Sequence, residues 1–194
     1  WMVAAVAVAG MNVPTRAGVD CNGTWQPLIG QPGMNASQTP DVRTFEVFNN
    51  TTMLGGSNEL YAGGKFKSAD GRSDICYIAK WGEGHVWERI DGQIGYYPFI
   101  DGPVNDLHTW GTGPDYGLYI GGEFTIVFTD GQNGPVVNHI VQWDGTQFIP
   151  LIQQGVAGVN GYVHAMVSFD HDNDPTTAIR LVAGGAFYKA GGVT

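Results

Sequence analysis

Residues 60–66 read Leu-Tyr-Ala-Gly-Gly-Lys-Phe, and the same phrase returns as Leu-Tyr-Ile-Gly-Gly-Glu-Phe at 118–124 and as Leu-Val-Ala-Gly-Gly-Ala-Phe at 181–187. The three phrases start 58 and 63 residues apart, which indicates an internal repeat of about sixty residues. Each is a β-prone apolar stretch in which two glycines stand where packed side chains normally would. We therefore expect another backbone or a large ring to press close to each glycine pair.

Further strand signals recur in a fixed order around this phrase. The first lies at 42–48, 104–110 and 163–169, where its length of seven and its Gly, Asp and Pro flanks favour a strand over a helix. After the phrase come a third signal at 75–81 and 138–143 and a fourth at 87–90 and 148–151. Four short strands in each unit predict an all-β chain, a β-propeller-like array of four-stranded antiparallel blades.

The repeats divide the chain into about three blades' worth of sheet, incomplete at both ends. Complete blades are expected at 42–90 and 104–151, the C-terminal part of a blade at 1–28, and the N-terminal half of a blade at 163–194. The two incomplete ends are complementary, so either the chain is a fragment of a longer propeller or a second copy completes the half-blade. Because folded proteins avoid unpaired strand edges, pairing between copies predicts a homo-oligomer or a filament.

The composition supports this fold and excludes some partners. Thirty glycines and only 14% charged residues suit many short strands joined by turns. A formal net charge of −9 repels phosphate backbones, so nucleic acid is not an expected partner. No apolar run is long enough for a membrane span, and membrane insertion is not expected. Cys21 and Cys76 are interpreted either as buried thiols or as a single bridge.

The order of motifs in residues 42–194 resembles a known repeat. It runs Val-x-x-apolar, Leu-Tyr-x-Gly-Gly-x-Phe, Ser-Ala-x-Gly, Ile-Ala-x-Trp and Trp-x-x-Leu, with a Trp-Asp-Gly turn at 143–145. This pattern is similar to the delta-60-type propellers of bacterial extracellular proteins and to the kelch-like propeller region of fungal cortical marker proteins. The resemblance implies an extracellular or cell-surface β-propeller used for recognition, adhesion or scaffolding, and it is uninformative about enzymatic activity.

One acidic turn is a candidate cation site. Asp170, Asp172 and Asp174 place three carboxylates on alternate positions, as calcium-binding loops do. The glutamate that would close a twelve-residue loop is missing, because position 181 is Leu181. The alternative interpretation is an acidic hairpin turn, and no other cofactor is expected.

Four acceptor sequons for N-linked sugar lie within residues 22–52, at Asn22, Asn35, Asn49 and Asn50. In a eukaryotic protein they predict a secreted, glycosylated surface. In a bacterial protein they indicate only a polar loop.

Aromatic residues divide into repeated and non-repeated positions. Trp81, Trp87, Trp110 and Trp143 recur at fixed repeat positions, so they are expected to pack between blades. Tyr96, Tyr97, Phe99 and Tyr162 lie in loops that differ between repeats, and they are the candidate binding residues for a polysaccharide or a surface protein.

No motif for catalysis is present: the sequence contains no nucleophile elbow, HExxH helix, phosphate loop or dinucleotide-binding motif. Loop carboxylates that could in principle pair as a glycosidase site are Asp91, Asp101, Asp106, Asp115 and Asp130. We expect a non-enzymatic structural protein that self-associates through its incomplete blades. The alternative is a surface binding module that recognises glycan or protein through its variable loops.

Overall fold

The computed structural model describes Met34 and residues 40–51, 56–82, 86–91, 100–128, 134–170 and 179–193. These residues form antiparallel strands, with one short 3-10 turn, η1, at Gly113–Asp115. The all-β prediction is therefore confirmed for the described chain. The blade fragment expected at 1–28 lies outside the described residues.

Two four-stranded antiparallel sheets follow one another along the chain. The first sheet contains β1 (Asp41–Asn50), β2 (Ser57–Lys65), β3 (Ile78–Trp81) and β4 (Trp87–Glu88), hydrogen-bonded in that order. The second sheet repeats the arrangement with β5 (Val104–Trp110), β6 (Gly117–Gly122), β7 (Ile140–Trp143) and β8 (Phe148–Pro150).

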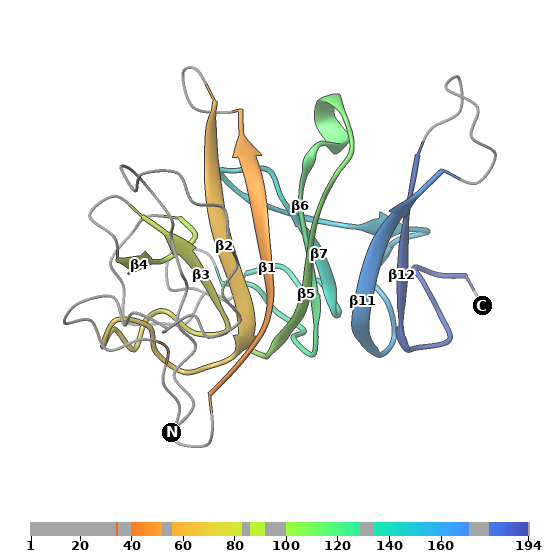
Figure 1. Cartoon of the computed structure of the whole chain (residues 1–194). Coiled ribbons are helices and arrows are strands. Elements are labelled where there is room, and N and C mark those ends of the chain that lie inside the picture. The colour runs from red at the N-terminus through yellow and green to blue at the C-terminus, as the bar shows by residue number, and fades with distance from the viewer. Residues whose placement is uncertain are drawn as a thin grey trace, which may run out of the picture.

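The third sheet has two strands among the described residues, β11 (Tyr162–Phe169) and β12 (Arg180–Ala186). A small hairpin of β9 (Ile152–Gln153) and β10 (Val156–Ala157) precedes it. Figure 1 shows the three sheets standing side by side, with β1, β5 and β11 next to one another along the row. The described strands form a row of stacked sheets and do not close into a ring.

The glycine pair of each phrase faces a bulge in the first strand of its own sheet. The strand register slips by one residue at Val42/Thr44, Val104/Asp106 and Val163/Ala165, opposite Gly63–Gly64, Gly121–Gly122 and Gly184–Gly185. A Cβ on the second glycine would collide with the backbone carbonyl oxygen of Asp41, Pro103 or Tyr162, respectively. The expected close approach of another backbone is therefore present at all three second glycines.

The third strands begin later than the sequence predicts. The strands expected from 75 and 138 start at Ile78 and Ile140, because Tyr77 and His139 adopt positive φ angles of 65° and 71°. The carbonyl oxygen of Tyr77 accepts a hydrogen bond from the backbone N–H of Gly64 at 2.9 Å. Gly122 makes the same 2.9 Å bond to His139, so both sheets share this irregular entry into the third strand.

The described residues form three apolar clusters that hold the sheets together. The largest lies between the first and second sheets and includes Phe48, Tyr61, Leu107, Ile120 and Trp143. A second lies between the second and third sheets around Tyr119, Val163 and Met166. A third covers the far side of the first sheet around Ala62, Phe66 and Trp87.

Candidate functional site

The junctions between sheets depend on the first glycine of each pair. A Cβ placed on Gly63 would lie 2.5 Å from Val104 Cγ1, and a Cβ placed on Gly121 would lie 2.6 Å from Val163 Cγ1. Both valines are fully buried. Each first glycine is therefore a socket that receives the valine opening the first strand of the following sheet.

Aromatic side chains seal each junction beside the socket. At the first junction Phe48 and Tyr61 are completely buried, and Tyr116 stacks on Phe48 with ring centroids 5.5 Å apart. At the second junction the rings of Trp110 and Tyr119 meet in a T-shaped arrangement, also with centroids 5.5 Å apart. Burial, together with the nearby Asp115 charge, raises the pKa of Tyr119 to about 12. Its hydroxyl therefore stays protonated at neutral pH and donates to the carbonyl oxygen of Asp115.

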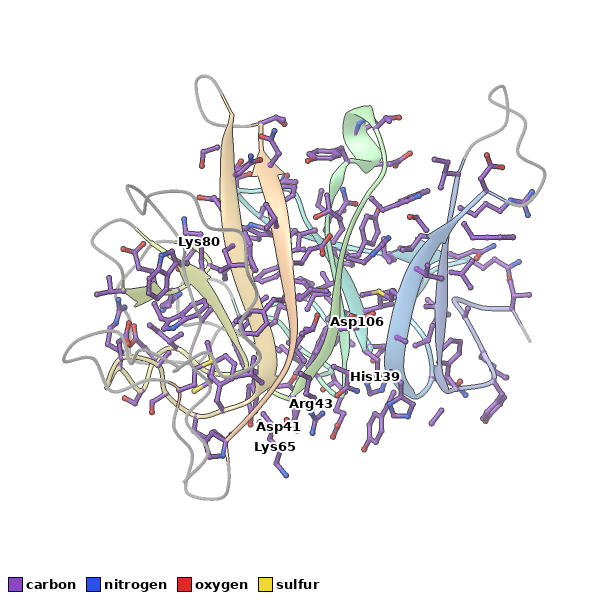
Figure 2. All side chains as sticks on the ribbon, in the orientation of Figure 1. Asp41, Arg43, Lys65, Lys80, Asp106 and His139 are labelled. Carbon is purple, nitrogen blue, oxygen red and sulfur yellow. The ribbon has the colours of Figure 1, made fainter. Side chains whose placement is uncertain are left out.

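Carboxylates bridge the sheets at the same junctions. Glu46 accepts the backbone N–H of Thr109 at 2.8 Å, and Asp106 accepts the backbone N–H of Met166. Asp106 also accepts the hydroxyl of Thr44 at 3.3 Å, so its side chain contacts both neighbouring sheets (Figure 2). These bonds satisfy N–H groups that the bulged strands leave outside the ladder.

Arg43 joins the first two sheets at one end of the stack, close to Asp41 (Figure 2). Its guanidinium donates to Asp41 at 2.8 Å, to Glu123 at 2.9 Å and to Asn105. Partial burial alone would lower the pKa of Arg43, but the bonds to the two carboxylates outweigh it and raise the pKa. Asn105 in turn donates to the carbonyl oxygen of Val163 at 2.7 Å, which continues the connection to the third sheet.

The outer face of the third sheet lacks such a neighbour among the described residues. The outward-facing residues of this sheet are here called the open face: Ala165, Val167, Phe169, Arg180, Val182 and Gly184. Phe169 is 54% exposed and Val182 is 45% exposed, although their counterparts in the first sheet, Phe48 and Tyr61, are fully buried. A Cβ on Gly184 would meet no atom within 4 Å. The expectation of a close neighbour at this first glycine is therefore wrong for the described chain, and the socket is open.

A pocket opens between the second and third sheets near η1. Its volume is about 490 Å³, and its walls combine Trp110, Tyr116 and Ile179 with the polar residues Thr109, Thr112, Asp115 and Ser168. Trp110 donates its indole N–H to the carbonyl oxygen of Ile179 at 3.1 Å. Ile179 takes the place that Tyr116 holds at the first junction, and it leaves Trp110 half-buried, where Phe48 is fully covered.

Most of the expected binding and cation residues lie outside the described chain. Tyr96, Tyr97 and Phe99 do, and so do Asp172 and Asp174, which leaves Asp170 alone of its acidic turn. Tyr162 was expected in a loop but is the first residue of β11; it is half-exposed, and its ring centroid lies 5.3 Å from that of His139. It sits at the opposite end of β11 from the pocket, whose residue on that strand is Ser168. No group of three metal-binding side chains occurs in the described ranges.

The sequons differ in accessibility. Asn22 and Asn35 lie outside the described residues, Asn49 is exposed, and Asn50 is only 2% exposed. The Asn50 amide donates to Glu59 at 3.2 Å and to the carbonyl oxygen of Gly145 at 3.4 Å. A sugar on Asn50 would have to displace both contacts, so the fold leaves Asn49 as the more accessible acceptor of the two.

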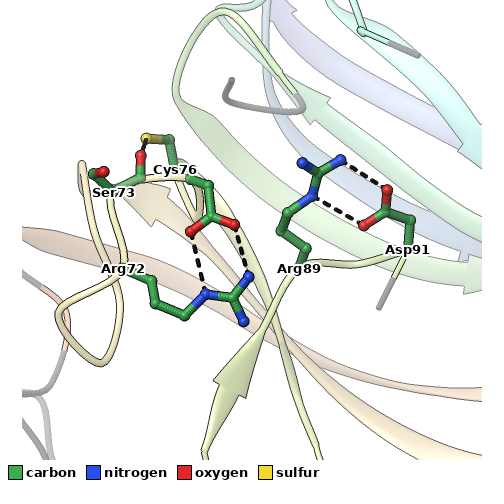
Figure 3. A network of polar contacts seen from close by, with 6 residues as sticks. Arg72, Ser73, Cys76, Arg89 and Asp91 are labelled. Atoms are coloured by element: carbon green, nitrogen blue, oxygen red, sulfur yellow. Dashed lines mark hydrogen bonds and ion pairs between the residues drawn. The ribbon is translucent and has the colours of Figure 1, made fainter. Parts of the chain in front are cut away.

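Several loop carboxylates already hold structural contacts. Figure 3 shows Asp91 in a two-bond ion pair with Arg89, at 2.7 Å and 3.0 Å. Asp101 accepts two backbone N–H groups and the Thr125 hydroxyl, which fixes the loop before β5. Asp106 was expected in a loop but lies within β5, where it bridges the sheets, and Asp115 lines the pocket. Asp130 lies outside the described residues.

Cys76 belongs to the same network as the Arg72–Asp74 ion pair. Its thiol is buried and free, and its single hydrogen has two carbonyl acceptors within reach, that of Ser73 at 3.3 Å (Figure 3) and that of Lys67 at 3.1 Å. Burial raises the pKa of the Cys76 thiol, and the positive charge of Lys67 offsets this only in part. This thiol is a packing element and has little thiolate character.

Two features of the site were missed by sequence reasoning. The Gly184 socket has the same phrase as the filled sockets, so no local signal separates it from them. Trp110 packs between the second and third sheets as expected, but sequence reasoning did not anticipate the pocket that it lines. The available signal was the replacement of Tyr116 by the smaller Ile179 at the matching repeat position.

Comparisons with known proteins do not place the chain in a family. No protein-family model matches it, and neither a curated protein nor a solved structure does. The described residues contain no helix with the length and apolarity needed to cross a bilayer. The class that the fold itself defines is an all-β chain of stacked antiparallel sheets, and the resemblance to delta-60-type and kelch-like propellers remains a prediction.

Proposed function

We propose that this chain is a structural repeat module of the β-propeller type that self-associates by completing its two-stranded third sheet with another copy. The observation that carries this proposal is that, among the described residues, β11 and β12 expose an apolar face and a free strand edge. Their outer face exposes Val167, Phe169 and Val182, and β12 pairs with β11 alone among the described strands. The first and second sheets have four strands each.

Both surfaces have a physical reason to be covered. A free strand edge offers unpaired N–H and C=O groups, which attract another strand. Covering an apolar face removes it from water, which contributes a favourable free energy of about 25 cal/mol for each Å² of apolar surface. Pairing and stacking by one partner would satisfy the edge and the face together. The proposed setting is extracellular or at the cell surface, which the exposed Asn49 sequon supports.

The acidic charge of the chain sets a condition on this association. Copies with a net charge of −9 repel one another, and salt screens that repulsion. Raising the ionic strength from about 0.01 M to about 0.15 M shortens the screening length from about 30 Å to about 8 Å. Association through apolar faces should therefore strengthen with salt, whereas an ion-paired interface would weaken.

Sedimentation velocity of the 194-residue chain over a wide concentration range tests the proposal. The expected result is a weight-average mass that rises with concentration above that of one chain, and that rises further at the higher ionic strength. A single species of monomer mass under every condition would refute self-association.

The pocket beside Trp110 favours a second candidate function, recognition of a neutral sugar. An indole wall combined with hydroxyl and carboxylate groups suits a ring that has apolar faces and polar edges. Trp110→Ala should abolish binding on an array of polysaccharides, with Trp87→Phe as a control outside the pocket. Unchanged binding by Trp110→Ala, or no binding by the unmodified chain, would remove this candidate.

A further inference from the structure

We propose that the socket at Gly184 receives Val42 of a second copy, so that copies join head to tail through the same contact that joins the sheets within one chain. This inference rests on the proposed self-association and names its partner surface. It concerns the face of the third sheet and not its strand edge.

The two internal junctions define what fits a socket. Gly63 receives Val104, and Gly121 receives Val163, each the valine at the bulge of the next first strand. The valine Cβ lies 3.2 Å from the Cβ position of the glycine in both cases. An identical spacing at two places along the chain indicates one contact that is used repeatedly.

The open socket keeps the same backbone form as the filled ones. Gly184 lies opposite Ala165 at the bulge of the third sheet, just as Gly63 lies opposite Thr44 and Gly121 opposite Asp106. Its φ angle is not positive, and the space beyond it is open. The third sheet therefore presents a formed receptor for a valine.

The matching valine without a socket is Val42. Among the described first strands β1, β5 and β11, only β1 has a bulge valine that no glycine receives. The apolar residue three places later is Phe45, which is 47% exposed, while its counterparts Leu107 and Met166 are 3% and 8% exposed. Val42 and Phe45 thus repeat the pair that covers a socket at each internal junction.

The join between copies lacks one internal contact. Glu46 and Asp106 each accept a backbone N–H from the next sheet, but the open face carries Val167 and Ala165 at those two positions. The incoming strand gains no carboxylate acceptor there. We therefore expect the join between copies to be weaker than the internal junctions, and reversible.

The geometry of the join is heterologous. The two surfaces differ and lie at opposite ends of the row of sheets, so one join leaves both a socket and a valine free. Repeating the join gives an open chain of copies, or a ring if the rotation closes.

The first arm of the test fills the socket. Gly184→Leu should abolish the concentration-dependent rise in mass seen by sedimentation, and it should keep a native circular dichroism spectrum because its side chain points into open space. Gln147→Leu adds the same side chain to an exposed turn of the second sheet and should associate normally. If Gly184→Leu associates as the unmodified chain does, the socket is not used and this inference fails, although the proposed function stands. If the unmodified chain sediments as a monomer, both this inference and the proposed self-association are refuted.

The second arm identifies the partner strand by disulfide trapping. A chain with Val42→Cys mixed with a chain with Gly184→Cys should form a covalent heterodimer on mild oxidation, in excess over either variant alone. The internal standard is the double variant Gly63→Cys with Val104→Cys, whose Cβ positions lie 3.2 Å apart, close to the roughly 3.5–4.5 Å of natural disulfides. If the internal pair closes but no heterodimer forms, Val42 is not the occupant and the inference is overturned.

Discussion

Adding a single methyl group to the first glycine of a pair should destabilise a filled socket and leave the open one unharmed. At Gly121 the new Cβ would lie 2.6 Å from Val163 Cγ1 and 3.2 Å from Met166 Cε. Because the Val163 side chain is fully buried, the neighbouring sheet must shift, and overpacking of this kind costs about 1–3 kcal/mol. Gly184→Ala meets no atom, and replacing a strand glycine by alanine gains about 0.5–1 kcal/mol.

Because both substitutions replace a strand glycine by alanine, that gain cancels, and the two variants should differ by the overpacking cost of about 1–3 kcal/mol in the free energy of unfolding. Urea titration followed by tryptophan fluorescence measures this, at a protein concentration low enough to keep the chain monomeric. The slope of unfolding free energy against urea should be the same for both variants. Val163→Ala in the Gly121→Ala background should cost less than in the unmodified chain, because it removes the colliding methyl groups. Equal stability of Gly121→Ala and Gly184→Ala would refute the socket interpretation.

Three further outcomes are expected. The Cys76 thiol should resist a thiol-reactive chromophore in the native chain and react fully in denaturant, since it is buried and its pKa is raised by burial; rapid native labelling would contradict this. Burial lowers the pKa of His139 in the folded chain, despite the opposing charge of Asp101. The unfolded chain therefore binds a proton at this residue more readily, and the free energy of unfolding should fall as the pH drops through about 6.5. His139→Asn, which tolerates the positive φ, should reduce the difference in urea midpoint between pH 8 and pH 5, and an unchanged difference would exclude this residue. Asp106→Ala should lower the free energy of unfolding by about 1–3 kcal/mol because the Met166 N–H loses its acceptor, with a smaller loss for Asp106→Asn; equal effects of the two would contradict the bridging role.

The sequence alone predicts the strand order of the first two sheets because its signals there are local. Short apolar runs bounded by turn residues mark β1, β2, β5 and β6, and the glycine pairs mark the bulges that their partners impose. The third strands are predicted too early, because Tyr77 and His139 take left-handed conformations that their residue types do not favour. Hydrogen bonds from Gly64 and Gly122 hold them there, and such bonds depend on the folded sheet.

The candidate site is less accessible to sequence reasoning. Gly63, Gly121 and Gly184 occupy the same place in the same phrase, and only the presence or absence of a neighbouring sheet distinguishes them. The pocket depends on how Ile179 fits beside Trp110, which is a matter of shape between two sheets. Local sequence patterns predict strands and turns. Whether a socket is filled, or a pocket forms, depends on the side chains of the neighbouring sheet, which a local pattern does not contain.

The valine-in-glycine contact also has a consequence for how such a molecule can grow. Each sheet has a glycine socket on one face and a bulge valine on the other. Every added sheet therefore fills one socket with its valine and presents a new socket of its own. Duplicating one whole unit of about sixty residues would thus lengthen the row without requiring any new kind of contact. Evolution or an engineer can set the length of the array by counting units, with the chemistry of the connection held constant.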